Sequence, residues 1–243
     1  MKDKAVMIYI KKLIVLLPLG FLLSACGGGG DSGGAQSSSA VSTYTFNVLQ
    51  AYVNDLTTPS SRNMTVSGTL SGYAVTGSGA ITSGQISNAT FGSAQALQRT
   101  ETVSANLTAN GQTYPFNLAV TMYTGLNYSP LAISSPVEYA VIVGTPTLPT
   151  AAHVYDAGIA YNFDRYRDST KAVYLGTGQS TYVVEADTAT TAKVKFITTY
   201  KDTLSNVASV ATSIYRISAS NVYTYISVSS VDYTNGNMLT YSF

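Results

Sequence analysis

The chain has 243 residues, only 10% of them are charged, and its formal net charge is +1. About a quarter of the residues of an average soluble protein are charged, so Ser, Thr, Gly and the 19 Tyr take a larger share of the surface here. The length suits one large domain or two small ones. Nucleic acid is excluded as a partner, because binding to phosphates needs a basic patch.

The first 25 residues have the layout of a secretory signal peptide. Four lysines precede the apolar run Leu13–Leu23, and small residues follow it. The alternative is a transmembrane helix. The stretch from Leu13 to Ala25 has 13 residues, however, and a bilayer needs roughly 20. Pro18 and Gly20 also disfavour a continuous helix.

The four residues Leu23-Ser24-Ala25-Cys26 resemble the lipobox of bacterial lipoproteins at every position. The resemblance implies that the thiol of Cys26, the only cysteine, is joined to diacylglycerol as a thioether. It also implies that a peptidase cuts between Ala25 and Cys26 and that the new amine receives a fatty acid such as palmitate. Two or three acyl chains, at about 0.8 kcal/mol per buried CH₂, would hold the protein at the membrane essentially permanently.

Gly27 follows the lipobox cysteine, where lipoproteins retained in the inner membrane tend to carry Asp. The resemblance therefore implies the outer membrane of a Gram-negative bacterium, with the body facing either the periplasm or the exterior. Residues 26–43 are the lipidated Cys and a Gly- and Ser-rich tether, whose mean reach is some 20–25 Å. The glycines do not match a phosphate-binding loop, because no strand precedes them and no Lys-Ser/Thr follows. Removing residues 1–25 leaves nine basic and eleven acidic side chains, a net charge of about −2.

Residues 44–243 are predicted to form an all-β body, an antiparallel sandwich or barrel of about a dozen strands. Short runs alternate between apolar and polar residues, as half-buried strands do, and show almost no helical periodicity. A short helix is predicted near Ser205–Thr212, although Asn206–Ile217 also suits a strand. The alternating runs are 64–70, 103–109, 114–120, 155–163, 192–200, 221–232 and 237–243.

Turn residues indicate how these strands connect. The pairs Asn110-Gly111 and Asn235-Gly236 predict two hairpins. Pro115 has no N–H, which places its strand at a sheet edge or places Pro115 near the start of the strand. Four prolines fall within residues 130–149 and mark either a boundary between two lobes or one long loop.

The densest charge lies in the segment from Asp164 to Lys171. Asp164 and Asp168 could ligate Ca²⁺, or Arg165 and Arg167 could bind an acidic ligand. The Asp-x-Asp-x-Asp-Gly pattern of a Ca²⁺ loop is missing, so a solvated hairpin loop is the simpler interpretation.

Tyr223 and Tyr225 form a second candidate ligand contact. With Tyr215, Tyr233 and Tyr241 nearby in sequence, they could make an aromatic platform for sugars. The alternative is that these rings pack as cross-strand pairs.

We expect no catalytic residue, no metal and no cofactor. His153 is the only histidine, so a multi-His metal site cannot be built. No Gly-x-Ser-x-Gly turn supports a Ser-His-Asp triad around it. A lipidated Cys26 cannot act as a nucleophile.

These patterns predict a lipid-anchored envelope protein that acts as a non-catalytic binding or structural module. Its partners would be the membrane, through the anchor, and a glycan or another envelope protein. Two alternatives stay open. Leu239, Tyr241 and Phe243 resemble the closing strand of outer-membrane barrels, which suggests an integral β-barrel. The other alternative is a carbohydrate-active or esterase-like enzyme.

Overall fold

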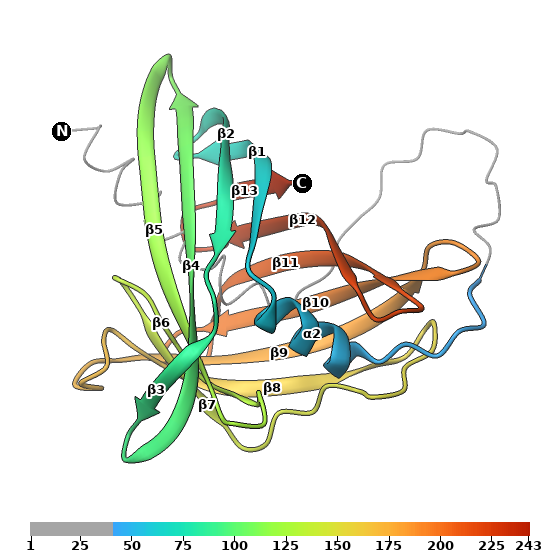
Figure 1. Cartoon of the computed structure of the whole chain (residues 1–243). Helices are drawn as coiled ribbons and strands as arrows, with labels where there is room; N and C mark the ends of the chain where they lie inside the picture. The colour runs from blue at the N-terminus through green and yellow to red at the C-terminus, as the bar shows by residue number, and fades with distance from the viewer. Residues whose placement is uncertain (1–40) are drawn as a thin grey trace.

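The computed structural model describes residues 41–243, and the predicted signal peptide and most of the tether lie outside them. Of these described residues, 64% lie in strands and 5% in a helix (Figure 1). One helix, α2 (Val48–Thr57), precedes thirteen strands. The strands are β1 (Ser60–Leu70), β2 (Tyr73–Ser83), β3 (Ser87–Phe91), β4 (Ala94–Ala109), β5 (Gln112–Thr124), β6 (Pro130–Ser134), β7 (Tyr139–Val143), β8 (Ala157–Tyr166), β9 (Tyr174–Ala186), β10 (Thr191–Lys201), β11 (Val207–Ser218), β12 (Tyr223–Asp232) and β13 (Asn237–Ser242).

Twelve of the strands close into one antiparallel barrel, and β3 is an extra strand that pairs only with β4. The neighbours run β10-β11-β12-β13-β1-β2-β4-β5-β6-β7-β8-β9, and β9 returns to β10. The all-β prediction is therefore confirmed, and of the two predicted architectures the chain adopts the barrel. The proline-rich segment 130–149 contributes β6 and β7 to this same sheet, so the strands before and after it belong to one wall.

Both predicted Asn-Gly hairpins are present. Ala109 pairs with Gln112 across the first turn, where Asn110 and Gly111 have φ of 49° and 71°. These left-handed values suit a tight two-residue turn, and Gly adopts them without steric cost. The second hairpin joins β12 and β13, with Asp232 opposite Asn237.

The predicted helix at 205–212 is wrong, because Val207–Ser218 forms β11, as the alternative interpretation proposed. The helix lies instead at Val48–Thr57. Asn47 caps its first turn by accepting a hydrogen bond from the Gln50 N–H at 2.8 Å. Its buried residues, Val48, Ala51, Tyr52 and Leu56, follow the three- and four-residue spacing of a helix face.

The inside of the barrel is apolar and rich in rings. The largest fully buried side chains are Tyr161, Tyr200, Tyr215, Tyr241, Phe46, Phe163 and Phe196. Inward-facing residues of four strands contact α2: Arg62 of β1, Arg99 of β4, Met122 of β5 and Tyr225 of β12. The helix therefore lies inside the wall, where it fills part of the space that a barrel of this many strands encloses.

Strand alternation predicted most inward faces, with one exception on β8. A bulge between Ile159 and Tyr161 shifts the register against β9. Ala160 consequently turns inward and is fully buried, whereas Ile159 is half exposed. The alternation in 155–163 predicts that Tyr155 and Ile159 share a face with Tyr161 and Phe163. The extra residue of the bulge separates Ile159 from the other two, and Tyr155 lies before β8 and is exposed.

Candidate functional site

The predicted charged cluster lies at the end of β8 and in the loop to β9, and Arg165 is already engaged there. Its Nε and Nη2 donate to the two carboxylate oxygens of Glu138 at 2.8 and 2.7 Å. Its Nη1 donates to the carbonyl oxygen of Lys201 at 3.2 Å, and its guanidinium lies 5.1 Å from the centre of the Tyr200 ring. The bidentate ion pair links β8 to the β6–β7 turn, and the hydrogen bond to Lys201 links β8 to β10.

The other members of the cluster do not converge with Arg165 on one site. Asp164 is on the opposite face of β8, as strand alternation requires. Asp168 accepts hydrogen bonds from the N–H and the hydroxyl of Thr170 at 2.9 and 2.5 Å. These bonds lower the pKa of the exposed Asp168 carboxyl. Arg167 is exposed, and its N–H donates to the Val173 carbonyl at 2.9 Å. The geometry is that of an ordered hairpin loop.

Tyr223 and Tyr225 face the interior of the barrel. The Tyr225 hydroxyl donates to Asp55 at 2.8 Å, and the Tyr223 hydroxyl donates to the Val48 carbonyl at 3.3 Å. The Tyr215 ring lies between them, with centres 5.0 Å from Tyr223 and 4.8 Å from Tyr225. Burial raises the pKa of the Tyr225 hydroxyl. These rings hold α2 against the wall, which corresponds to the packing interpretation of the pattern.

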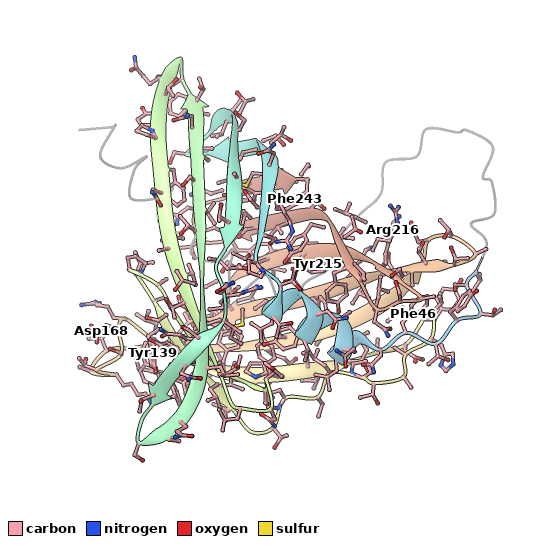
Figure 2. The ribbon with its side chains drawn as sticks, in the orientation of Figure 1. Phe46, Tyr139, Asp168, Tyr215, Arg216 and Phe243 are labelled. Carbon is pink, nitrogen blue, oxygen red and sulfur yellow. The ribbon has the colours of Figure 1, made fainter. Side chains whose placement is uncertain are left out.

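The two predicted sets of residues are far apart. Tyr225 pairs with Tyr215, which in turn pairs with Val194 of β10. Arg165 reaches Lys201, which is roughly 23 Å further along the same strand at 3.3 Å per residue. Figure 2 shows the same separation between Asp168 in its loop and Tyr215 near the helix.

The sequence did not predict a group of four charged side chains beneath α2: Asp55, Arg62, Arg99 and Glu101. Asp55 accepts from Arg62 Nη2 at 2.7 Å and from Arg99 Nη2 at 3.4 Å, and Arg99 Nη2 also donates to Glu101 Oε1 at 2.6 Å. Arg99 and Glu101 share the inward parity of Val103 on β4. Extending the alternation of residues 103–109 towards the N-terminus would have predicted that Arg99 and Glu101 face inward.

The four charges compensate one another, and no net charge is left inside. Burial raises the pKa of the Glu101 carboxyl, and Arg99 acts in the opposite direction. Arg99 also donates to the Asp55 carbonyl oxygen in the last turn of α2 at 2.5 Å, where cations suit the helix dipole. Arg99 and Glu101 are each only 2% exposed, and through Asp55 the group links α2 to β1 and β4.

His153 lies in the loop before β8. Its ring Nε2 is 3.1 Å from the Thr45 hydroxyl, and its backbone N–H donates to the Asp156 carboxylate at 2.7 Å. Within residues 41–243, no three His, Cys, Asp or Glu side chains lie close enough together to hold a metal ion. Ala25 and Cys26, the predicted cleavage and lipidation residues, lie outside the described residues.

An open groove crosses the outer face of β13, β1, β2, β4 and β5. One part has a volume of about 660 Å³ and is lined by Asn63, Thr65, Ser78, Asn106, Ser242 and Phe243, among others. The second part, about 360 Å³, shares Ser78 and Asn106 and continues to Pro115 and Asn117. No ionisable side chain lines either part.

Within residues 41–243, no helix is long and apolar enough to cross a membrane. Comparison of the chain with models of protein families, with characterised proteins and with solved structures found no match, so no activity is carried over from a relative.

Proposed function

We propose that this protein is an outer-membrane lipoprotein whose β-barrel stands in water and acts as a non-catalytic binding or structural module. The proposal combines the lipobox at Leu23–Cys26 and the Gly-rich tether with the polarity of the barrel wall. The single observation that carries it is this polarity: apolar side chains face inward and polar side chains face outward.

A barrel that crosses a lipid bilayer needs the reverse arrangement, an outward apolar band of about 25 Å. Here the outward positions of β4 and β5 include Ser104, Asn106, Thr113 and Asn117, all exposed. The inward positions on the same strands include Val103, Leu107, Phe116 and Leu118, all buried. Such a wall matches water outside and a packed core inside.

Charges on the outer face support the same proposal. Lys193 and Lys195 project outward from β10, and Arg216 projects from β11. At the middle of a bilayer each Lys or Arg on the lipid face would cost about 2–4 kcal/mol. In water they form ion pairs with Glu185 of β9 and with Asp187, which directly follows β9.

An integral outer-membrane barrel remains the second candidate, and the closure of the twelve strands favours it. Extraction of membranes separates the two candidates. We expect a Cys26→Ala variant to leave the membrane fraction in alkaline carbonate or in urea, whereas the wild-type chain stays. Because Cys26 lies far from the barrel wall in sequence, the substitution leaves the fold intact, and the far-ultraviolet circular dichroism of the released protein verifies this. Retention of the folded variant in the membrane would establish the integral barrel instead.

A further inference from the structure

We propose that the outer face of β13, β1, β2, β4 and β5 is a binding surface for a neutral polysaccharide. This deepens the proposed binding role and rests on it. The strands lie side by side in this order, and β4 and β5 extend furthest from the rest of the barrel (Figure 1).

The register of the five strands arranges their outward side chains in rows across the sheet. Neighbouring strands are about 4.8 Å apart, so a row across all five spans roughly 19 Å. Four rows follow from the pairing. Two cross four strands, Ser61–Thr82–Thr102–Ala119 and Asn63–Ala80–Ser104–Asn117, and two cross all five, Ser242–Thr65–Ser78–Asn106–Pro115 and Thr240–Ser67–Thr76–Thr108–Thr113.

None of these side chains ionises, and nearly all carry a hydroxyl or an amide. The opposite part of the wall differs, because the ion pairs of β9, β10 and β11 lie there. The outward charges of the described strands therefore lie outside the five-strand face, on β8 to β11 and their loops. A charged ligand would find no opposite charge on the five-strand face. An uncharged ligand needs no opposite charge, so it loses no electrostatic attraction there.

The groove on this face is shallow and open, and it is lined mainly by polar side chains. Three amides line it, those of Asn63, Asn106 and Asn117. An amide both donates and accepts, as a hydroxyl does, and sugar hydroxyls require both. Ser and Thr beside the amides are short, so little side-chain entropy is lost on binding.

At one end of the groove, the ring of Pro115 offers apolar atoms to the C–H face of a sugar. Phe243 at the other end shares the inward parity of Leu239 and Tyr241, and its ring lies 5.5 Å from the inward-facing ring of Tyr225, so it offers no ring face to this surface. A protein partner would instead be expected to meet a core of large exposed aromatic side chains, and the four rows contain none. The chemistry of the face therefore favours a neutral glycan.

Native gel electrophoresis through immobilised polysaccharide tests this assignment on the full chain, purified from membranes in detergent. Dextran, amylose, laminarin and xylan serve as neutral probes, and alginate serves as an acidic probe. We expect at least one neutral polymer to retard the wild-type protein, and alginate to have no effect. A double substitution, Asn63→Ala with Asn106→Ala, should weaken the retardation at least tenfold in apparent affinity.

The matched control is Asn162→Ala, which removes an exposed amide from β8 outside the five-strand face, and it should bind as the wild type does. Three results would overturn the assignment: no retardation by any neutral polymer, equal retardation of the double variant, or stronger retardation by alginate. Each can occur while Cys26 is lipidated, so the failure of this inference is distinct from the failure of the proposed anchor.

Discussion

At the scale of single residues, Asp55 is the acceptor on which the interior depends. It receives hydrogen bonds from Arg62, Arg99 and Tyr225 at 2.7, 3.4 and 2.8 Å. Substituting Asp55→Asn keeps the shape and removes the charge, which leaves two guanidinium groups against one carboxylate. We expect a loss of about 3 kcal/mol in the free energy of unfolding, since an uncompensated buried charge is costly. Urea unfolding measures it.

Asp168→Asn is the control for that substitution, because this carboxyl is exposed and bonds only within its own loop. Its effect should stay within about 0.5 kcal/mol. Equal effects of the two substitutions would mean that the charges beneath α2 contribute nothing specific.

Asp187 predicts how stability responds to acid. Arg216 donates to it from Nε at 2.5 Å, Thr191 donates at 2.6 Å, and these bonds lower the pKa of the carboxyl to about 2 from its usual 3.8. The unfolded chain therefore binds a proton first as the pH falls. The stabilisation is present above about pH 4 and is lost towards pH 2, and after solvent screening it amounts to about 1 kcal/mol.

Asp187→Asn should therefore be less stable than the wild type at neutral pH, and the difference should shrink as the pH falls from 4 to 2. Thermal unfolding across that range measures the trend. Arg216→Gln removes the partner and should give the same profile. A difference that is constant with pH would contradict the assigned cause.

At the scale of elements, the outer half of β5 is an open sheet edge. The strand pairs with β4 along its whole length, whereas β6 pairs only with Thr121–Thr124. Pro115 lies in the open half, opposite Asn106, and it has no N–H to offer a further strand. The prediction that proline marks an edge is confirmed, and its position suggests protection against pairing between molecules.

Pro115→Thr should restore a donor to this edge and promote self-association, which sedimentation velocity would detect as a shift from monomer towards dimer. Adding Ala119→Lys, a charge on the same edge, should return the double variant to the monomer. If Pro115→Thr remains monomeric at every concentration at which the wild type is soluble, the edge is protected by another feature.

Strands and tight turns were predictable because their signals are local. The alternation in 103–109 and 114–120, with Asn110-Gly111 between them, specifies a hairpin within one short window. Helix α2 was missed although Asn47 and the spacing of its apolar residues indicate it, because the surrounding alternation led to a uniform strand interpretation. The bulge at Ile159 has no local signal, since it arises from pairing with β9.

The candidate sites were less predictable than the strands for a related reason. Alternation tells which residues share a face, and Tyr223 and Tyr225 do share one. Alternation does not predict that α2 covers this face. That contact joins residues about 170 positions apart in the chain, as the hydrogen bond between Tyr225 and Asp55 shows. In the sequence, Arg165 likewise has no evident partner. Folding places Glu138, 27 residues away, beside it.

At the scale of the whole molecule, closure decides the architecture. β1 pairs with β13 from Thr65 to Thr69, so the first and last strands adjoin. A sandwich and a barrel can have the same strands and hairpins and differ only in such long-range pairs. The sequence therefore left both forms open. Closure gives each of the twelve barrel strands a neighbour on each side for at least part of its length, and the sheet keeps few exposed edges.

The central claim is the proposal that the barrel stands in water and is held to a membrane through lipid on Cys26. Mass spectrometry of the N-terminal peptide, from protein isolated out of its native membranes, tests it most directly. The account predicts a peptide that begins at Cys26 and carries the mass of a diacylglyceryl thioether, with a further acyl group on the amine. An intact leader, or an unmodified thiol at residue 26, would contradict it.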